Sequence, residues 1–259
     1  MLNLLAADIV ERFYTFMWPM LRISALMLTA PILSQNAINT RLRILIAMVL
    51  TWLVLPLHSW PKLDPASAEG LLQVFHQVAI GATMGLVMQI VVAAVVLGGQ
   101  SISSALGLSM ANMIDPNLGS VPVISQFLLV LASLIFVGFG GHAILLALIS
   151  ESFKTIPIGS SFLSQAMLGK VVQWSSMMFL GALLMALPVM VFLLFVNMGL
   201  GIITRAAPSL NIFAVGFAAM IPAGLLVMII SMTHIGHRIE WLWLQSFLRV
   251  RNLLGITGG

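Results

Sequence analysis

The sequence predicts an all-α integral membrane protein on three grounds. Of its 259 residues, 61% are hydrophobic and only 7% are charged, whereas about a quarter of a soluble domain is charged, and the mean hydropathy is +1.13. Several apolar blocks approach the roughly 20 residues that a helix needs to cross a bilayer. The blocks are continuous, whereas strands of a membrane barrel alternate apolar and polar residues in segments of about ten.

Six apolar blocks are the candidate spans. They run approximately from Phe13 to Leu33, Ile44 to Leu57, Leu71 to Leu97, Phe127 to Ile149, Met177 to Ile203 and Ile212 to Ile235. The second block is the shortest, and it is either a span or a re-entrant hairpin. If all six blocks cross the bilayer, the two ends of the chain lie on the same side.

The basic residues then indicate the orientation. With Arg22 counted as intramembrane, seven basic residues lie on the side of the termini and three on the other side. The seven are Arg12, Lys62, Lys154, Lys170, Arg238, Arg249 and Arg251, and the three are Arg41, Arg43 and Arg205. Because cytoplasmic loops carry an excess of Lys and Arg, this distribution favours cytoplasmic termini.

Composition also limits the targeting and the partners of the chain. The N-terminal residues MLNLLAADIVERF lack a small-residue cleavage site, so we expect the first span to be the targeting signal. The absence of cysteine excludes disulfides and thiolate metal sites. The pI of about 10.4 comes from few charges of either sign and fits anchoring at a lipid surface, with no nucleic acid partner.

We predict a single membrane domain, 1–259, because no repeat or low-complexity linker divides the chain. Two loops are expected within it. The first, 98–125, is rich in Gly and Ser, and Asp115 is its only charge; the second, 150–174, contains the turn signal Pro157-Ile158-Gly159.

The search for catalytic or metal-binding motifs gives little. His234 and His237 have the spacing H-x-x-H, but the Glu of a zinc-protease helix is missing, so we interpret them as a helix end at the lipid interface. Asp115 and Glu151 fall in or beside loops, whereas a proton-coupled pump carries acids inside its spans. The chain is therefore expected to be no enzyme, with no cofactor and no metal.

Glycine and proline indicate how the helices pack. Gly81 and Gly85 form a G-x-x-x-G pair inside a span, which allows two helix backbones to approach closely. Pro31, Pro188 and Pro222 lie within or beside apolar runs, where the missing amide hydrogen bond favours a kink. We therefore expect bent rather than straight spans.

Four blocks, in order, resemble the FliR family of flagellar export-gate proteins. They are FMWPMLRISALMLTAPILS (16–34), ISSALGLSMANMIDP (102–116), ESFKTIPIG (151–159) and ALPVMVFLLFVNMGLGIITRAAPSLNIFAVGF (186–217). Together they cover most of the chain up to Phe217, and no pattern of the family is found after Arg238. The same family includes the T-type subunit of virulence type III secretion systems, although the match is closer to the flagellar form.

The resemblance implies a subunit of the flagellar type III protein export gate in the bacterial inner membrane, at the flagellar basal body. The chain would be present as one copy with several copies of FliP and FliQ, would bind FlhB, and would pass unfolded proteins as cargo. It also implies bent helical hairpins: FliP-like helices over about 1–175, followed by a FliQ-like hairpin and C-terminal tail over 176–259.

The same resemblance suggests a pore plug in the first loop, 98–125. In the family the GLSM-x-x-x-x-DP loop projects into the central pore, and this chain matches it at Gly107, Leu108, Met110, Met113, Asp115 and Pro116. Methionine side chains are adaptable enough to close an opening of variable width. The alternative is an ordinary connecting loop.

Arg205 lies at the end of an apolar run, before a turn through Pro208 and Asn211. It is either an anchor that reaches the lipid interface or a clamp on a FliP or FliQ neighbour. Arg22, inside an apolar block, presents the same choice. Two further classes remain as alternatives, a small-molecule or ion transporter and an intramembrane enzyme, but the inverted repeats and intramembrane polar sites that they need are not found.

Overall fold

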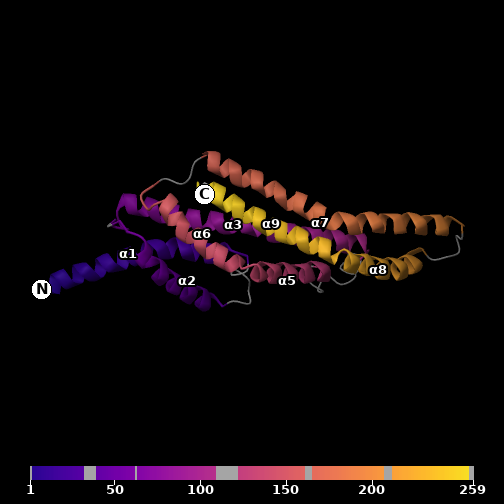
Figure 1. Cartoon of the computed structure of the whole chain (residues 1–259), viewed down its shortest axis with the longest axis horizontal. Coiled ribbons are helices and arrows are strands. Elements are labelled where there is room, and N and C mark those ends of the chain that lie inside the picture. The colour runs from indigo at the N-terminus through magenta and orange to yellow at the C-terminus, as the bar shows by residue number, and fades with distance from the viewer. Residues whose placement is uncertain are drawn as a thin grey trace. The chain divides into compact units, whose positions relative to one another are not determined.

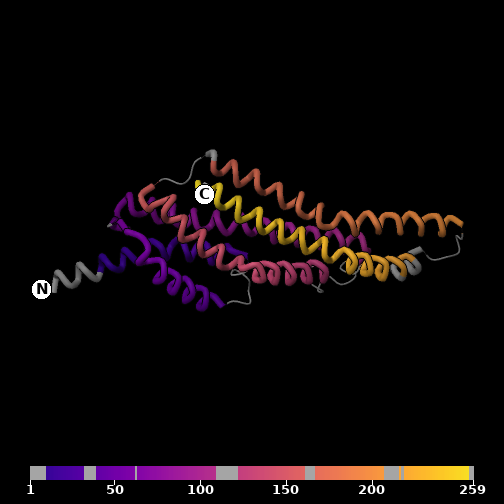
Figure 2. The backbone as a smooth tube through the Cα atoms, in the orientation of Figure 1, coloured from indigo at the N-terminus to yellow at the C-terminus, as the bar shows by residue number. Residues whose placement is uncertain are grey.

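A computed structural model describes residues 2–31, 39–61, 63–108, 122–160, 165–206 and 212–256 (Figures 1 and 2). Helices account for most of the described residues and no strand occurs among them, which confirms the all-α fold class. The helices are α1 (Leu2–Thr29), α2 (Thr40–Val54), α3 (Ala68–Ala105), α5 (Val123–Gly138), α6 (Gly141–Thr155), α7 (Gln165–Ala206), α8 (Ile212–Ile230) and α9 (Met232–Leu253), with a short 3-10 helix η1 (Leu55–Leu57) after α2.

The chain forms two compact units. Unit 1 contains Met1–Gln89, Gly140–Ser175 and Gln245–Gly259, and unit 2 contains Ile90–Phe139 and Ser176–Leu244. Each unit therefore takes segments from both sides of residue 175. The division into a FliP-like part (1–175) and a FliQ-like part (176–259) stays a prediction.

The core of unit 1 forms where α1, α3 and α6 contribute large apolar side chains. Its fully or almost fully buried members are Trp18, Ile23, Leu26, Ile80, Met84, Met88, Leu148, Ile149 and Phe153. Trp174, near the start of α7, donates its indole N–H to the carbonyl oxygen of Val87 at 3.0 Å. A buried indole needs such an acceptor, so this bond fixes the start of α7 on α3.

The core of unit 2 contains side chains of α3, α5, α7 and α9. Its most buried members are Val91, Val95, Ile102, Leu128, Ala132, Met185, Val189, Leu193, Ile239 and Trp243. The indole of Trp243 donates to the carbonyl oxygen of Ala132 at 3.1 Å, and its ring meets that of Phe136 edge-on at 4.8 Å between centroids. These contacts attach α9 to α5 within the unit.

The first predicted loop, 98–125, begins later than expected. Residues 98–105 belong to α3, and α5 already begins at Val123. A Cβ at Gly98 would lie 2.2 Å from Met185 Cε, and one at Gly99 would lie 2.6 Å from Ser125 Cα. The two glycines therefore allow close packing of α3 on α7 and α5, and this packing outweighs their low helix propensity.

The second predicted loop, 150–174, is also shorter than expected, because α6 continues to Thr155 and α7 begins at Gln165. The turn at Pro157-Ile158-Gly159 is confirmed. Ser160 N–H donates to the Pro157 carbonyl at 3.2 Å, and Gly159 has a φ of 101°, a conformation that favours glycine.

Fewer candidate spans than the six predicted blocks are found among the residues that the structure describes. Among the described residues, three helical segments are long and apolar enough to cross a bilayer: Thr40–Leu57, Ala68–Ala105 and Met167–Ala206. The count rises to five if each of two bent helix pairs, α5 with α6 and α8 with α9, is one span. Because the assignment of loops to the two sides assumed six crossings, the count of seven basic residues against three no longer supports an orientation.

The breaks have identifiable positions. Between α5 and α6, Gly140 has a φ of 75°, and between α8 and α9 the bend of 59° is at Ser231. Pro188 and Pro222 lie inside α7 and α8. The expected departure from straight spans is therefore present, but the interruptions that define the bent pairs do not coincide with these prolines.

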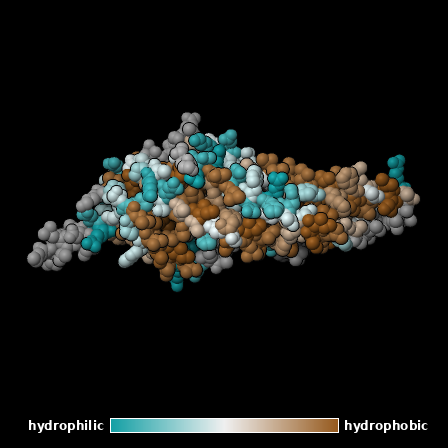
Figure 3. Space-filling view, viewed as in Figure 1, coloured by the Kyte–Doolittle hydropathy of each residue, from teal (hydrophilic) through white to brown (hydrophobic). Residues whose placement is uncertain are grey.

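Exposed apolar side chains follow two helices. On α2 they include Val49, Trp52 and Leu53, and on the second half of α7 they include Phe195, Met198 and Ile202. Figure 3 shows hydrophobic surface over both helices. Such contiguous apolar surfaces need lipid or protein to cover them.

Candidate functional site

Arg22 is the most deeply buried charged residue that the structure describes, with an exposed fraction of 0%. It lies in the second half of α1 and points between α3 and α6 of unit 1. A charged side chain inside an apolar protein is costly unless it is fully hydrogen-bonded, so its acceptors are informative.

Five hydrogen bonds use the five N–H groups of the guanidinium. The Nε and Nη2 atoms both donate to Oε1 of Gln77, the first at 2.8 Å. The Nη1 atom donates to the carbonyl oxygen and to the hydroxyl of Ser152, at 2.8 and 3.0 Å. The Nη2 atom also donates to the carbonyl oxygen of Ile156 at 2.9 Å. All of these acceptors are neutral.

The end of α6 is built to accept this charge. The Ser152 and Ile156 carbonyls lie at the C-terminus of that helix, where carbonyls lack helical partners and the helix dipole is negative. The ring of Phe153 lies 4.2 Å from the guanidinium carbon, which is a cation–π contact. Arg22 therefore joins α1, α3 and α6 into one cluster, which we call the Arg22 cluster.

Gly81 and Gly85 bring α3 close to α1 beside this cluster. A Cβ at Gly81 would lie 2.2 Å from the Arg22 carbonyl oxygen, and one at Gly85 would lie 1.9 Å from the Thr29 hydroxyl oxygen. Gln77, Gly81 and Gly85 recur at four-residue intervals and share one face of α3. The glycines and the amide that accepts from Arg22 therefore act at the same helix contact.

Sequence reasoning identified Arg22, Gly81 and Gly85 but missed Gln77, Ser152 and Phe153. A signal for Gln77 was present, because a polar amide inside an apolar span generally faces protein rather than lipid. With every guanidinium nitrogen bonded inside the chain, Arg22 has no exposed donor for a lipid headgroup or a neighbouring subunit.

In unit 2, α3 ends at the start of the predicted plug. Gly107 has a φ of 79°, Leu108 N–H donates to the Ser103 carbonyl at 3.1 Å, and Gly107 N–H donates to the Ser104 carbonyl at 3.0 Å. This pair of bonds is a Schellman motif, which requires the left-handed glycine. Met110, Met113, Asp115 and Pro116 lie outside the described residues.

The segment 109–121 has fixed ends. Before it, Leu106 is fully buried and a Cβ at Gly224 would lie 1.9 Å from Leu106 Cδ2, so α8 packs on this side chain. After it, the Ser125 hydroxyl in the first turn of α5 donates to the Val96 carbonyl at 3.1 Å. The residues on both sides of the predicted plug are therefore packed within unit 2.

Arg205 lies in the last turn of α7 and is exposed. A cation at a helix C-terminus is favourable because the helix dipole is negative there. No hydrogen bond or ion pair of Arg205 occurs among the residues that the structure describes, and Pro208 and Asn211 lie outside them. The choice between an anchor and a clamp stays open.

The two histidines of the H-x-x-H motif lie on exposed positions of α9. His237 Nδ1 lies 3.8 Å from Glu240 Oε2, one turn further along the helix. Within the described ranges, no group of three His, Asp or Glu side chains is arranged to hold a metal ion.

Comparison with known proteins gives a consistent result. The sequence profile of a family described as bacterial export proteins, family 1, matches residues 13–246, which extends past Arg238. Proteins named flagellar biosynthetic protein FliR are similar over most of their length. The relative from Pectobacterium carotovorum is 36% identical over 88% of each chain. The one from Escherichia coli is 34% identical over 90% of this chain and 89% of its own. The one from Bacillus subtilis is 29% identical over 97% of this chain and 98% of its own.

Proposed function

The chain belongs to family 1 of the bacterial export proteins, and we propose that it is a subunit of the flagellar type III protein export gate. The observation that carries this proposal is the similarity, over nearly nine-tenths of both chains, to relatives named as flagellar biosynthetic proteins. Those names favour the flagellar machine over a virulence secretion system. The gate lies in the bacterial inner membrane, and this subunit has a structural rather than an enzymatic role.

The partners are FliP and FliQ, which form the protein-conducting channel with one copy of this chain, together with FlhB. Two features support an assembly. The helices α3 and α7 contain 38 and 42 residues, well above the roughly 20 that cross a bilayer. Their exposed apolar side chains, such as Leu86 on α3 and Phe195 on α7, extend over more length than lipid alone covers, so neighbouring subunits cover the rest.

The loop that follows Gly107 is the pore plug. A conduit for unfolded protein is wider than an ion, so at rest it leaks ions unless something deformable fills it. The Schellman motif at Gly107 and the Ser125 bond to Val96 hold the two ends of the loop. The sequence between them supplies Met110 and Met113, whose flexible apolar side chains close the opening and move aside for cargo.

Deletion of residues 110–116 tests this plug. We expect the complex to assemble, because the helix ends that hold the loop are kept, but to pass ions and small solutes at rest. The measurement is conductance across a planar bilayer or solute uptake into vesicles that carry the purified complex. A deletion complex that assembles and conducts no more than the intact one contradicts the plug and leaves the loop as a connector.

A pair of double variants is the matched control for the deletion. Met110 and Met113 replaced together by Leu keep an apolar filler of similar volume, so conductance should stay low. The same two residues replaced by Asp attract water and counter-ions into the opening, so conductance should rise. Equal conductance of the Leu and Asp variants counts against an apolar seal.

A further inference from the structure

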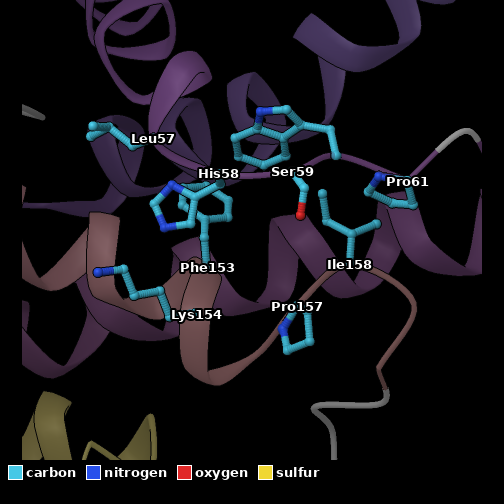
Figure 4. Close-up of a pocket in the computed structure, with 9 residues that line it drawn as sticks. Leu57, His58, Ser59, Pro61, Phe153, Lys154, Pro157 and Ile158 are labelled. Carbon is cyan, nitrogen blue, oxygen red and sulfur yellow. The ribbon is translucent and has the colours of Figure 1, made fainter.

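A pocket of about 600 Å³ lies in unit 1 (Figure 4). The connection from α2 to α3 contributes Leu57, His58, Ser59, Trp60 and Pro61 to its wall. The end of α6 contributes Phe153, Lys154, Pro157 and Ile158. The volume falls in the range of small-molecule sites.

The aromatic wall of the pocket is ordered. The indole N–H of Trp60 donates to the Leu55 carbonyl at 2.8 Å, and the rings of Trp60 and Phe153 meet edge-on at 5.2 Å between centroids. His58 packs on both rings, at 5.8 and 5.9 Å. The wall therefore has a fixed shape before any ligand arrives.

The polar groups of the pocket favour an anion. Lys154 is exposed and belongs to the lining, and in Figure 4 its amino group lies at the rim of the pocket, on the side away from Pro157 and Ile158. Both His58 nitrogens are buried, so His58 shapes the wall through its ring and Lys154 is the cation that a ligand can reach. Behind Phe153 lies the buried charge of Arg22. Among the residues that the structure describes, no carboxylate lines the pocket; Glu151, one turn before Lys154, is not part of it.

The position of the pocket indicates where the anion comes from. It begins at Leu57, the last residue of the candidate span Thr40–Leu57, so it lies at the depth where that span leaves the hydrocarbon. Tryptophan and lysine are typical of this interface. The neighbouring apolar side chains Trp52, Leu53 and Leu57 are 77%, 64% and 61% exposed, and they form a surface that acyl chains can cover.

We propose that this pocket binds the phosphate headgroup of an anionic membrane phospholipid. Lys154 contacts the phosphate, Trp60 lies beside the glycerol region, and the acyl chains follow the exposed face of α2. The inference requires only that the chain is embedded in a membrane. It does not depend on the role in protein export.

Native mass spectrometry of the full chain, in the detergent-solubilised complex in which it is isolated, tests the site. The probes are dioleoyl phosphatidylglycerol and dioleoyl phosphatidylcholine, which share their acyl chains and differ in headgroup charge. We expect one tightly bound phosphatidylglycerol per chain and weaker binding of phosphatidylcholine. Equal binding of the two lipids overturns the proposal, because the site would then recognise only the acyl chains.

Two lysine variants distinguish specific binding in the pocket from general attraction of anionic lipid to the basic protein surface. Lys154→Ala should weaken phosphatidylglycerol binding about fivefold, the effect of one interfacial cation. Lys170→Ala removes the same charge from an exposed position outside the pocket, and it should leave the tightly bound lipid unchanged. An equal loss in both variants shows non-specific attraction and overturns the proposal.

A third variant tests the cavity without changing any charge. Ser59→Trp fills the pocket, so it should remove the bound phosphatidylglycerol, while the recovered amount of complex reports on folding. Inorganic phosphate added as a competitor distinguishes the two sources of the anion. Displacement only by a large excess of phosphate supports a lipid site, and displacement at concentrations equal to the lipid shows a soluble-anion site and contradicts the lipid assignment.

Discussion

At Arg22 a permanent charge is kept inside an apolar unit by geometry. The guanidinium presents its donors as a rigid planar fork. Gln77 Oε1 accepts from two of its nitrogens, and the carbonyl oxygens of Ser152 and Ile156, at the end of α6, accept from the terminal nitrogens. An ammonium group has no such fork. The residue therefore determines how α1, α3 and α6 meet.

Replacing Arg22 by Lys should destabilise the complex although the charge is kept. At least one buried acceptor loses its donor, which costs about 2 kcal/mol or more, or about 4 to 8 °C in Tm for a chain of this size. A thermal unfolding scan of the detergent-solubilised complex measures the shift.

Arg205→Lys is the matched control, because Arg205 is exposed at the end of α7. It should leave Tm unchanged. If Arg22→Lys unfolds at the same temperature as the parent, the fork of hydrogen bonds does not stabilise unit 1. Normal assembly and export in Arg205→Lys would favour an interfacial anchor over a clamp on a neighbour.

At the scale of the elements, the break between α5 and α6 depends on one backbone conformation. Gly140 has a φ of 75° and caps the N-terminus of α6, whereas Gly138 ends α5 without a positive φ. A Cβ at either position would meet nothing within 4 Å. The two glycines therefore differ in their conformation and not in the space around them.

Gly140→Ala should lower the stability by about 1 to 2 kcal/mol, because a left-handed conformation is unfavourable for an L-residue. Gly138→Ala should be neutral or slightly stabilising, since alanine is the better helix former. The same thermal scan compares them. A Gly138→Ala variant that loses as much as Gly140→Ala would show that packing, rather than φ, limits the break.

The sequence predicted the class of elements well and their ends less well. Periodicity could not show that Gly98 and Gly99 continue α3, because their packing on Met185 and Ser125 brings together residues distant in the chain. The break at Gly140 could not be predicted for a different reason. The segments on both sides of it are apolar, so the hydropathy pattern does not change there. Both errors come from tertiary contacts or backbone conformation overriding a local pattern.

At the site, a single sequence could show which residues were unusual but not what they meet. Arg22 and the Gly81–Gly85 pair were identified from their types in an apolar run. Gln77 lies 55 residues after Arg22 and Ser152 lies 130 residues after it, so only the fold relates Arg22 to its acceptors. The pocket of His58 and Lys154 was missed for the same reason.

At the scale of the whole molecule, the chain is a membrane protein of the flagellar export apparatus. The units are held internally by buried tryptophans and the Arg22 cluster, while the outer faces of α2 and α7 expose large apolar side chains. Such faces need a cover of lipid or protein, and the proposed assembly supplies both. In the role proposed above, the chain forms part of the wall of a conduit and supplies its plug.

The most direct measurement of this claim is the export of flagellar proteins by cells that lack the chain. Extracellular flagellin and hook protein should be absent from the culture medium, while both proteins are still made inside the cells. A plasmid carrying the parent sequence should restore export. Normal amounts of extracellular flagellin in the deletion strain, with the chain shown to be missing, would contradict a role in the export gate.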